Sequence, residues 1–228
     1  MLALTLFGVF FVALAGVPLL FAMLTTTEGM IWWQDLGHPL ETIFLSFIGG
    51  VEPFILLAVP LFIFAGELLA QGGVGRRIVE FARVLFGWLP GGLGVVTVIS
   101  CTMFGGVSGS AIADTAAIGS LVIPAMVARG YSRGFAAALL AVAGTIALLM
   151  PLSIPFLVYA FISGVSMRSL SMAGLLPALV SALALIVVCM WHGRRSGCDN
   201  GDDRSTPAQI WAATKDAGPA LLMPIIII

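Results

Sequence analysis

A single acidic residue, Asp114, lies inside a long apolar stretch of this sequence. It is the only charged residue between Arg83 and Arg129. A carboxylate at membrane depth costs about 2.5–3.5 kcal/mol on insertion scales, so it is usually retained for a function. It follows the run Gly105-Gly106-Val107-Ser108-Gly109-Ser110, in which glycines free backbone carbonyls and serines supply hydroxyls. Hard cations such as Na⁺ prefer these oxygen ligands, so we predict an ion- or substrate-binding helix break here. The predicted site residues are Gly106, Ser108, Gly109, Ser110, Asp114 and Thr115.

A second break is predicted in the apolar stretch 134–163. Pro151 and Pro155 lie four residues apart, and together they remove two backbone donors from the hydrogen-bond ladder of a helix. Two broken helices that meet tip to tip would form a cage for a cation, and their N-termini would attract an anionic substrate. We therefore expect a discontinuous helix whose site residues are Thr145, Pro151, Ser153 and Pro155. Na⁺ is expected at Ser108, Ser110 and Thr145.

The same residues are also compatible with a structural or a catalytic role. Glycine and serine in membrane helices often serve only close helix packing, and Asp114 could snorkel or pair with an arginine. The run Gly106-Val107-Ser108-Gly109 also fits an intramembrane serine nucleophile, which needs a base within hydrogen-bond reach. The two histidines, His38 and His192, lie in polar segments, and no phosphate-binding loop precedes Lys215, the first lysine. We therefore expect a binding site and not an enzyme.

The segments that hold these residues must be membrane helices. Hydrophobic residues make up 60% of the 228-residue chain and charged residues 9%, whereas a soluble domain has roughly 25% charged residues. This small number of charges cannot cover the surface of a soluble protein. We therefore expect an all-α integral membrane protein in a lipid bilayer. The net charge of -1 argues against a nucleic-acid partner. Three widely spaced cysteines indicate neither a zinc site nor a disulfide framework, and no cofactor is expected.

The pattern of charges predicts membrane spans and their orientation. Residues 1–24 are expected to form a first span, and whether 30–50 also crosses is open. Basic residues cluster in three places that the positive-inside rule puts in the cytoplasm. These are residues 76–83, 129–133 and 194–215. The first of them is predicted as an amphipathic helix on the membrane surface. Both ends of 85–128 then lie on one side of the membrane, so this segment is predicted as a re-entrant hairpin.

Several motifs resemble the large membrane subunit of tripartite ATP-independent periplasmic (TRAP) transporters of bacteria and archaea. One is Phe64-Ala65-Gly66-Glu67-Leu68-Leu69, followed by Gly72-Gly73 and Arg76-Arg77. The longest is Phe104-Gly105-Gly106-Val107-Ser108-Gly109-Ser110-Ala111-Ile112-Ala113-Asp114-Thr115-Ala116-Ala117, which Ile123-Pro124-Ala125-Met126 continues. The motifs keep their order over nearly the whole chain but cover only about the first half of such a subunit. We therefore expect an N-terminal half.

The resemblance implies a fold as well. It would be the first repeat of an inverted-repeat, elevator-type ion transporter in the bacterial inner membrane. Residues 1–84 would form scaffold spans and an arm helix, and residues 85–163 would form half of a mobile transport domain. That half would contain the hairpin 85–128 and the broken helix 134–163. The remaining segments would be a last scaffold span at 164–191, a cytoplasmic loop at 192–216 and the start of a second repeat at 217–228.

The resemblance further implies a transported solute and partners. Na⁺ would drive import of an organic acid, such as a C4-dicarboxylate or a sialic-acid-like compound. A periplasmic substrate-binding protein would deliver it, and a small membrane subunit would brace the large one. The family's Gly-Pro step and Pro-Pro-Ser at the second break are replaced here by Ala147-Leu148 and Pro151-Leu152-Ser153. Because a lone first repeat is not expected to transport, the alternative is a non-transporting membrane scaffold or a truncated fragment that lacks the second repeat.

Overall fold

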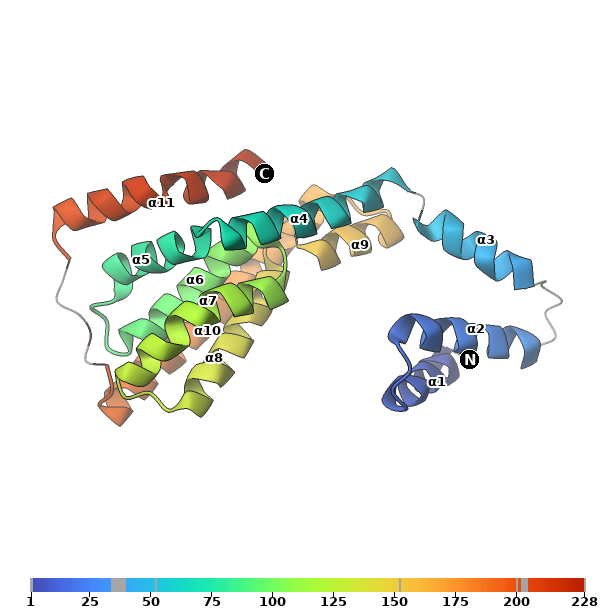
Figure 1. The fold of residues 1–228 in the computed structure, drawn as a ribbon, viewed down its shortest axis with the longest axis horizontal. Helices are drawn as coiled ribbons and strands as arrows, with labels where there is room; N and C mark the ends of the chain where they lie inside the picture. Colours follow the sequence, from blue (N-terminus) through green and yellow to red (C-terminus); the bar gives the residue numbers. More distant parts are fainter. Residues whose placement is uncertain are drawn as a thin grey trace. The chain divides into compact units, whose positions relative to one another are not determined.

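The computed structural model of the chain is all-helical over the residues it describes, which are 2–33, 40–51, 53–151, 153–199, 201 and 205–227 (Figure 1). This agrees with the all-α class expected from the composition. The chain forms two compact units, Met1–Phe54 and Ile55–Ile228. Within the described ranges, three helical stretches are long and apolar enough to cross a bilayer, and a helix pair bent by 62° makes a fourth if it counts as one span. The three stretches are Ala111–Ala128, Arg133–Ser163 and Met167–Ser196.

The described residues of the N-terminal unit form three helices, and they correct one expectation. They are α1 (Leu2–Leu14), α2 (Leu19–Trp33) and α3 (Leu40–Val51). The predicted single span 1–24 is wrong, because the chain leaves the helix after α1 and α2 packs against it. Gly16 has a left-handed φ of 87°, and Pro18 cannot donate to a continued helix ladder. Residues 34–39 lie outside the described residues, so a crossing by 30–50 stays a prediction.

A 3₁₀ turn (Phe54–Leu57) precedes a bent helix pair in the second unit. Helix α4 (Ala58–Gln71) meets α5 (Val74–Phe86) at an angle of 62°. Gly73 makes the bend possible, because its left-handed φ of 73° is a conformation that other residues rarely adopt. Helix α5 buries Gly75, Ile78 and Ala82 and exposes its charged side chains. This is the amphipathic pattern expected for residues 76–83.

A helical hairpin forms the centre of the second unit. Helix α6 (Gly92–Ser108) and helix α7 (Ala111–Ala128) pack together and are joined by Gly109 and Ser110 (Figure 1). Helix α6 is buried along nearly its whole length, because α5, α7, α8 and α10 all pack against it. A helical hairpin is therefore present within the expected segment 85–128, with its tip at Gly109. Whether it is re-entrant stays a prediction.

The apolar stretch after the hairpin is interrupted, as the two prolines predicted. Helix α8 (Arg133–Ile146) runs into a 3₁₀ turn, η2 (Ala147–Leu149), and α9 (Ile154–Ser163) begins five residues later. Pro155 lies in the first turn of α9, where its missing N–H has no helical partner to lose. Pro155 thus favours the start of α9, and the chain leaves the preceding helix before this residue.

Two further helices complete the chain, α10 (Met167–Ser196) and α11 (Pro207–Ile227). Helix α10 packs against α6, α8 and α9, and α11 packs against α5. Part of the stretch 192–216, which we expected to be a loop, is therefore helical. Pro207 suits the first position of a helix, and the Thr206 amide ahead of it donates to Gln209 Oε1 at 2.8 Å. The assignment of 164–191 to a scaffold domain stays a prediction.

Candidate functional site

The hairpin tip holds a buried serine–aspartate pair. Ser108 ends α6, and Asp114 lies in the first turn of α7. Both side chains are fully buried, and the Ser108 hydroxyl donates a hydrogen bond to Asp114 Oδ1. Gly109 links the helices in a left-handed conformation with φ of 63°. Ser110 is the N-cap of α7, and its hydroxyl accepts from the Ala113 amide at 3.4 Å. The tip residues predicted from sequence are thus held by ordinary helix-capping geometry.

The second oxygen of Asp114 has a different environment. Oδ2 is buried and has no hydrogen-bond partner among the described residues. It faces Gly105 of α6, since a Cβ built on that glycine would lie 3.2 Å from Oδ2 and would also collide with Ala147 of η2. The oxygen therefore lies where α6, α7 and η2 meet. A buried carboxylate oxygen without a donor is costly, so this point is suited to a cation.

The two helix breaks meet at the tip, as the sequence predicted. The Ile154 amide at the start of α9 donates to the Gly109 carbonyl at 3.5 Å. Ser153, the N-cap residue of α9, is fully buried, and its Oγ has no hydrogen-bond partner among the described residues. Gly106 lies near Met150, the residue that follows η2, and Pro151 is buried in the same break. Carboxylate, hydroxyl and carbonyl oxygens therefore gather where α7 and α9 begin.

Some of the predicted site residues face elsewhere. Thr145 is exposed, and its hydroxyl donates to the Val142 carbonyl of its own helix at 2.7 Å. The Thr115 hydroxyl donates to the Ala111 carbonyl at 2.6 Å, and it lies against Gly144 of α8. Pro155 is exposed. The structure does not gather these three side chains around the Asp114 carboxylate.

Helix α4 also reaches the hairpin tip. Gly66 is buried, and a Cβ built on it would lie 3.1 Å from the Ser108 carbonyl oxygen. The sequence reasoning used Gly66 only as part of a motif and did not place it at the site. Within the part of the chain that the structure describes, no group of three His, Cys, Asp or Glu side chains could hold a metal ion. A cation at the tip would thus be bound mainly by hydroxyl and carbonyl oxygens, with one carboxylate.

The opposite end of the hairpin contains a buried carboxylate that sequence reasoning missed. Asp199 Oδ2 accepts from the Leu93 amide at 2.7 Å and from the Tyr131 hydroxyl at 3.2 Å, and Oδ1 accepts from Arg129 Nη1 at 2.7 Å. Its own carbonyl accepts from the Gly91 amide at 3.0 Å. Asp199 therefore caps the N-terminus of α6 and ties it to the end of α7. Burial, together with the Asp199 charge, raises the pKa of Tyr131 above its ordinary value.

These features define a class of protein: a multi-helix membrane protein in which two helix breaks bring polar groups together inside an apolar bundle. Residues 1–228 match the family described as the tripartite ATP-independent periplasmic transporter, DctM component. The chain belongs to this family, as its motifs led us to expect.

Three relatives illustrate the family. The 2,3-diketo-L-gulonate TRAP transporter large permease protein of Escherichia coli is 35% identical over 93% of this chain and 50% of its own length. The C4-dicarboxylate TRAP transporter large permease protein of Vibrio cholerae is 39% identical over 76% of this chain and 38% of its own. That of Rhodobacter capsulatus is 32% identical over all of this chain and 55% of its own. The chain spans about half the length of the curated relatives it matches, or less. Their names are those of permeases and not of enzymes.

Proposed function

We propose that this chain supplies a cation-binding part of the large permease in a Na⁺-coupled secondary transporter that imports an organic acid. The observation that carries the proposal is the Asp114 carboxylate. It is fully buried, Ser108 holds Oδ1, and Oδ2 has no hydrogen-bond partner among the described residues. Since an uncompensated buried carboxylate is unfavourable, a cation bound beside it would stabilise the tip.

The available ligands favour Na⁺ over a transition metal. The groups at the junction are the Asp114 carboxylate, the Ser108 and Ser153 hydroxyls and backbone carbonyls, which are hard oxygen ligands. Transition metals favour imidazole and thiolate ligands, and no such cluster occurs among the described residues. We leave Thr145 out of the ligand set, because its hydroxyl is bonded within α8.

An anionic substrate fits the same junction. The N-termini of α7 and α9 both start there, and helix N-termini favour negative charge. The names of the relatives refer to 2,3-diketo-L-gulonate and C4-dicarboxylates, which are organic anions. We propose an organic acid of this class as substrate, delivered by a periplasmic binding protein to a bacterial inner-membrane carrier. The carrier would also contain a small membrane subunit and would work by an elevator movement of the hairpin and broken helix.

The test is uptake by the complete carrier, reconstituted in liposomes with its small subunit and binding protein. Labelled succinate and N-acetylneuraminate serve as probes, with an inward gradient of Na⁺ or of K⁺. We expect uptake of one probe with Na⁺ only, and loss of that uptake in Asp114→Asn. The matched control is Asp216→Asn, because Asp216 is an exposed acid 4.0 Å from Arg77. Uptake that persists in K⁺ or in Asp114→Asn would overturn the proposal, and a folded carrier with no uptake under any gradient would favour the scaffold alternative.

A further inference from the structure

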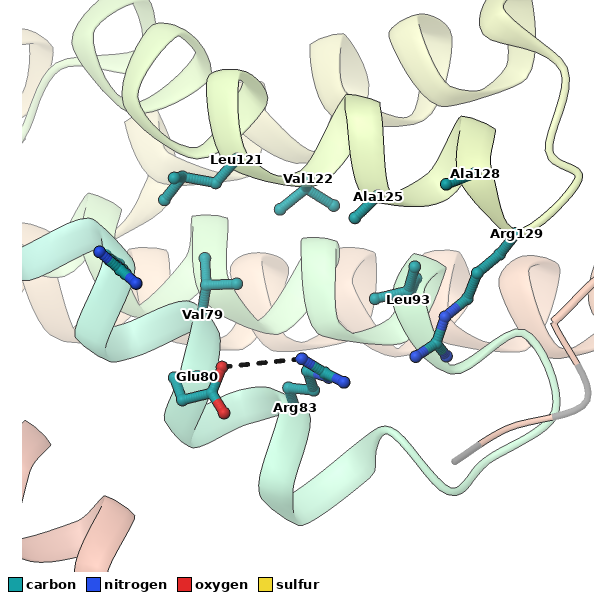
Figure 2. A pocket seen from close by; sticks show the side chains of 10 residues that line it. Val79, Glu80, Arg83, Leu93, Leu121, Val122, Ala125, Ala128 and Arg129 are labelled. Carbon is teal, nitrogen blue, oxygen red and sulfur yellow. Dashed lines mark ion pairs between the residues drawn. The ribbon is translucent and has the colours of Figure 1, made fainter. Parts of the chain in front are cut away.

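A cavity of about 390 Å³ lies between α5, α6 and α7, at the end of the hairpin opposite the tip. Its volume falls within the range of roughly 300–1,000 Å³ that is typical of small-molecule sites. Figure 2 shows α5 on one side and α7 on the other, with Leu93 of α6 between them. The cavity does not contain the Asp114 site and has no part in the proposed function.

The rim of this cavity is basic. Arg76 and Arg83 line it from α5, and Arg129 lines it from the end of α7. One acid, Glu80, also lines the cavity, and it lies 4.0 Å from Arg83 (Figure 2). Arg129 is fixed by its 2.7 Å ion pair with Asp199. Three arginines against the two acids, Glu80 and Asp199, leave one net positive charge at the rim, which favours an anion.

The inner wall of the cavity is apolar. Val79 of α5, Leu93 of α6 and Val122 of α7 line it between the two helices (Figure 2). A small soluble anion would leave this wall in contact with water, which is unfavourable for apolar surface. A ligand with a charged head and a hydrocarbon portion would cover both the rim and the wall.

The helices that line the cavity are of kinds that place basic residues near lipid headgroups. Helix α5 is amphipathic, with Gly75, Ile78 and Ala82 buried and the arginines exposed, as in helices that lie in the interface plane. Arg129 follows the last residue of α7, a helix apolar enough to cross the bilayer. Basic residues at such helix ends favour the cytoplasmic leaflet, where anionic lipids attract basic segments.

We propose that this cavity binds one anionic glycerophospholipid. The phosphodiester of the headgroup lies against Arg76 and Arg83, with Arg129 adding to the positive field. The start of an acyl chain lies against Val79 and Val122. Basic pockets between membrane helices are known to take lipid headgroups in this way. Because the lipid contacts both α5 and α7, its binding stabilises the packing of the amphipathic helix on the hairpin.

The experiment is native mass spectrometry of the complete permease complex in non-ionic detergent, with phosphatidylglycerol, phosphatidylethanolamine or phosphatidylcholine added. We expect one retained phosphatidylglycerol and weaker retention of the other two lipids. The double variant Arg76→Gln/Arg83→Gln should bind phosphatidylglycerol about 25-fold more weakly, from roughly a fivefold loss for each arginine. The control is Arg77→Gln/Arg133→Gln, which removes the same charge from exposed positions that do not line the cavity.

A second variant covers the case in which the arginine variant fails to fold. Ala125→Leu fills the cavity from α7 without changing any charge and should also lose phosphatidylglycerol. Equal retention by the wild type, the arginine variant and Ala125→Leu would overturn the proposal. Displacement of the lipid by sn-glycerol 3-phosphate or inorganic phosphate would assign the cavity to a soluble anion and would also overturn it. The readout is lipid binding, so it succeeds or fails independently of Na⁺-driven uptake.

Discussion

Two buried carboxylates lie at opposite ends of the α6–α7 hairpin, and their surroundings differ. At the base, both carboxylate oxygens of Asp199 accept hydrogen bonds, from Leu93 and Tyr131 on one oxygen and from Arg129 on the other. At the tip, Asp114 Oδ1 accepts from Ser108, while Oδ2 has no partner among the described residues. The surroundings of Asp199 are those of a structural group, and the buried oxygen of Asp114 without a partner supports the binding role that we propose for it.

Hydrogen-bond saturation separates structural from functional polar residues in an apolar bundle. A buried charge that is fully hydrogen-bonded stabilises one arrangement, and removing it leaves its partners unsatisfied. A buried charge with an open coordination position costs stability until a ligand arrives. The two carboxylates should thus respond in opposite directions to the same substitution.

The largest expected effect is on stability, in Asp199→Ala. This change leaves the Arg129 guanidinium, the Tyr131 hydroxyl and the Leu93 amide without their acceptor, at a cost of about 3 kcal/mol. Thermal unfolding of the complete permease in detergent should show a clearly lower Tm. Asp216→Ala, which affects only an exposed pair at 4.0 Å, should stay within about 0.5 kcal/mol of the wild type. An unchanged Tm in Asp199→Ala would contradict its structural role.

Asp114→Ala should behave in the opposite way when Na⁺ is absent. The substitution removes an uncompensated buried charge, so stability without Na⁺ should be unchanged or higher. With Na⁺ the wild type should gain up to about 2.7 kcal/mol at a concentration one hundred times Kd, and the variant should gain nothing. The measurement is Tm against NaCl, with choline chloride at equal ionic strength as the control. Equal stabilisation of both proteins by Na⁺ would place the ion elsewhere.

A smaller and more local effect is expected from added methyl groups at the tip. In Gly105→Ala the new Cβ collides with Ala147 and approaches Asp114 Oδ2, which should cost about 1–3 kcal/mol through overpacking. The matched control is the adjacent Gly106→Ala, whose Cβ would meet only the Met150 terminal methyl, at 3.5 Å. Stability and Na⁺ response are measured for both. Similar results for the two glycines would show that Gly105 and Ala147 are not tightly packed beside Asp114 Oδ2.

Part of this arrangement could be predicted from sequence because its causes are local. The run from Gly105 to Ser110 and the prolines at 151 and 155 interrupt helices through their own backbone chemistry. The Asp199 cluster depends on partners 106 residues away, at Leu93, and 70 residues away, at Arg129. Nothing local in the polar segment around Asp199 identifies that residue.

The local sequence also does not determine the direction in which a side chain points. Thr145 lies near the second break in the sequence, so it was predicted as an ion ligand with Ser108 and Ser110. Which face of α8 turns inward depends on its packing against α6 and α7, and the sequence near Thr145 does not specify that face. The same applies to Gly66, whose place beside Ser108 follows from the packing of α4 on α6.

The smallest effect is expected at Thr145. Its side chain is exposed and its hydroxyl is bonded to the Val142 carbonyl, so Thr145→Ala should shift stability by less than about 0.5 kcal/mol and leave the Na⁺ response intact. Ser153→Ala is the informative partner, since the Ser153 hydroxyl is buried at the junction without a hydrogen-bond partner among the described residues. That variant should keep its stability without Na⁺ and respond more weakly to the ion. If Thr145→Ala loses the response to Na⁺ and Ser153→Ala keeps it, the ion lies toward the exposed face of α8. The contrast between Asp114 and Asp199 would then no longer locate the ion site.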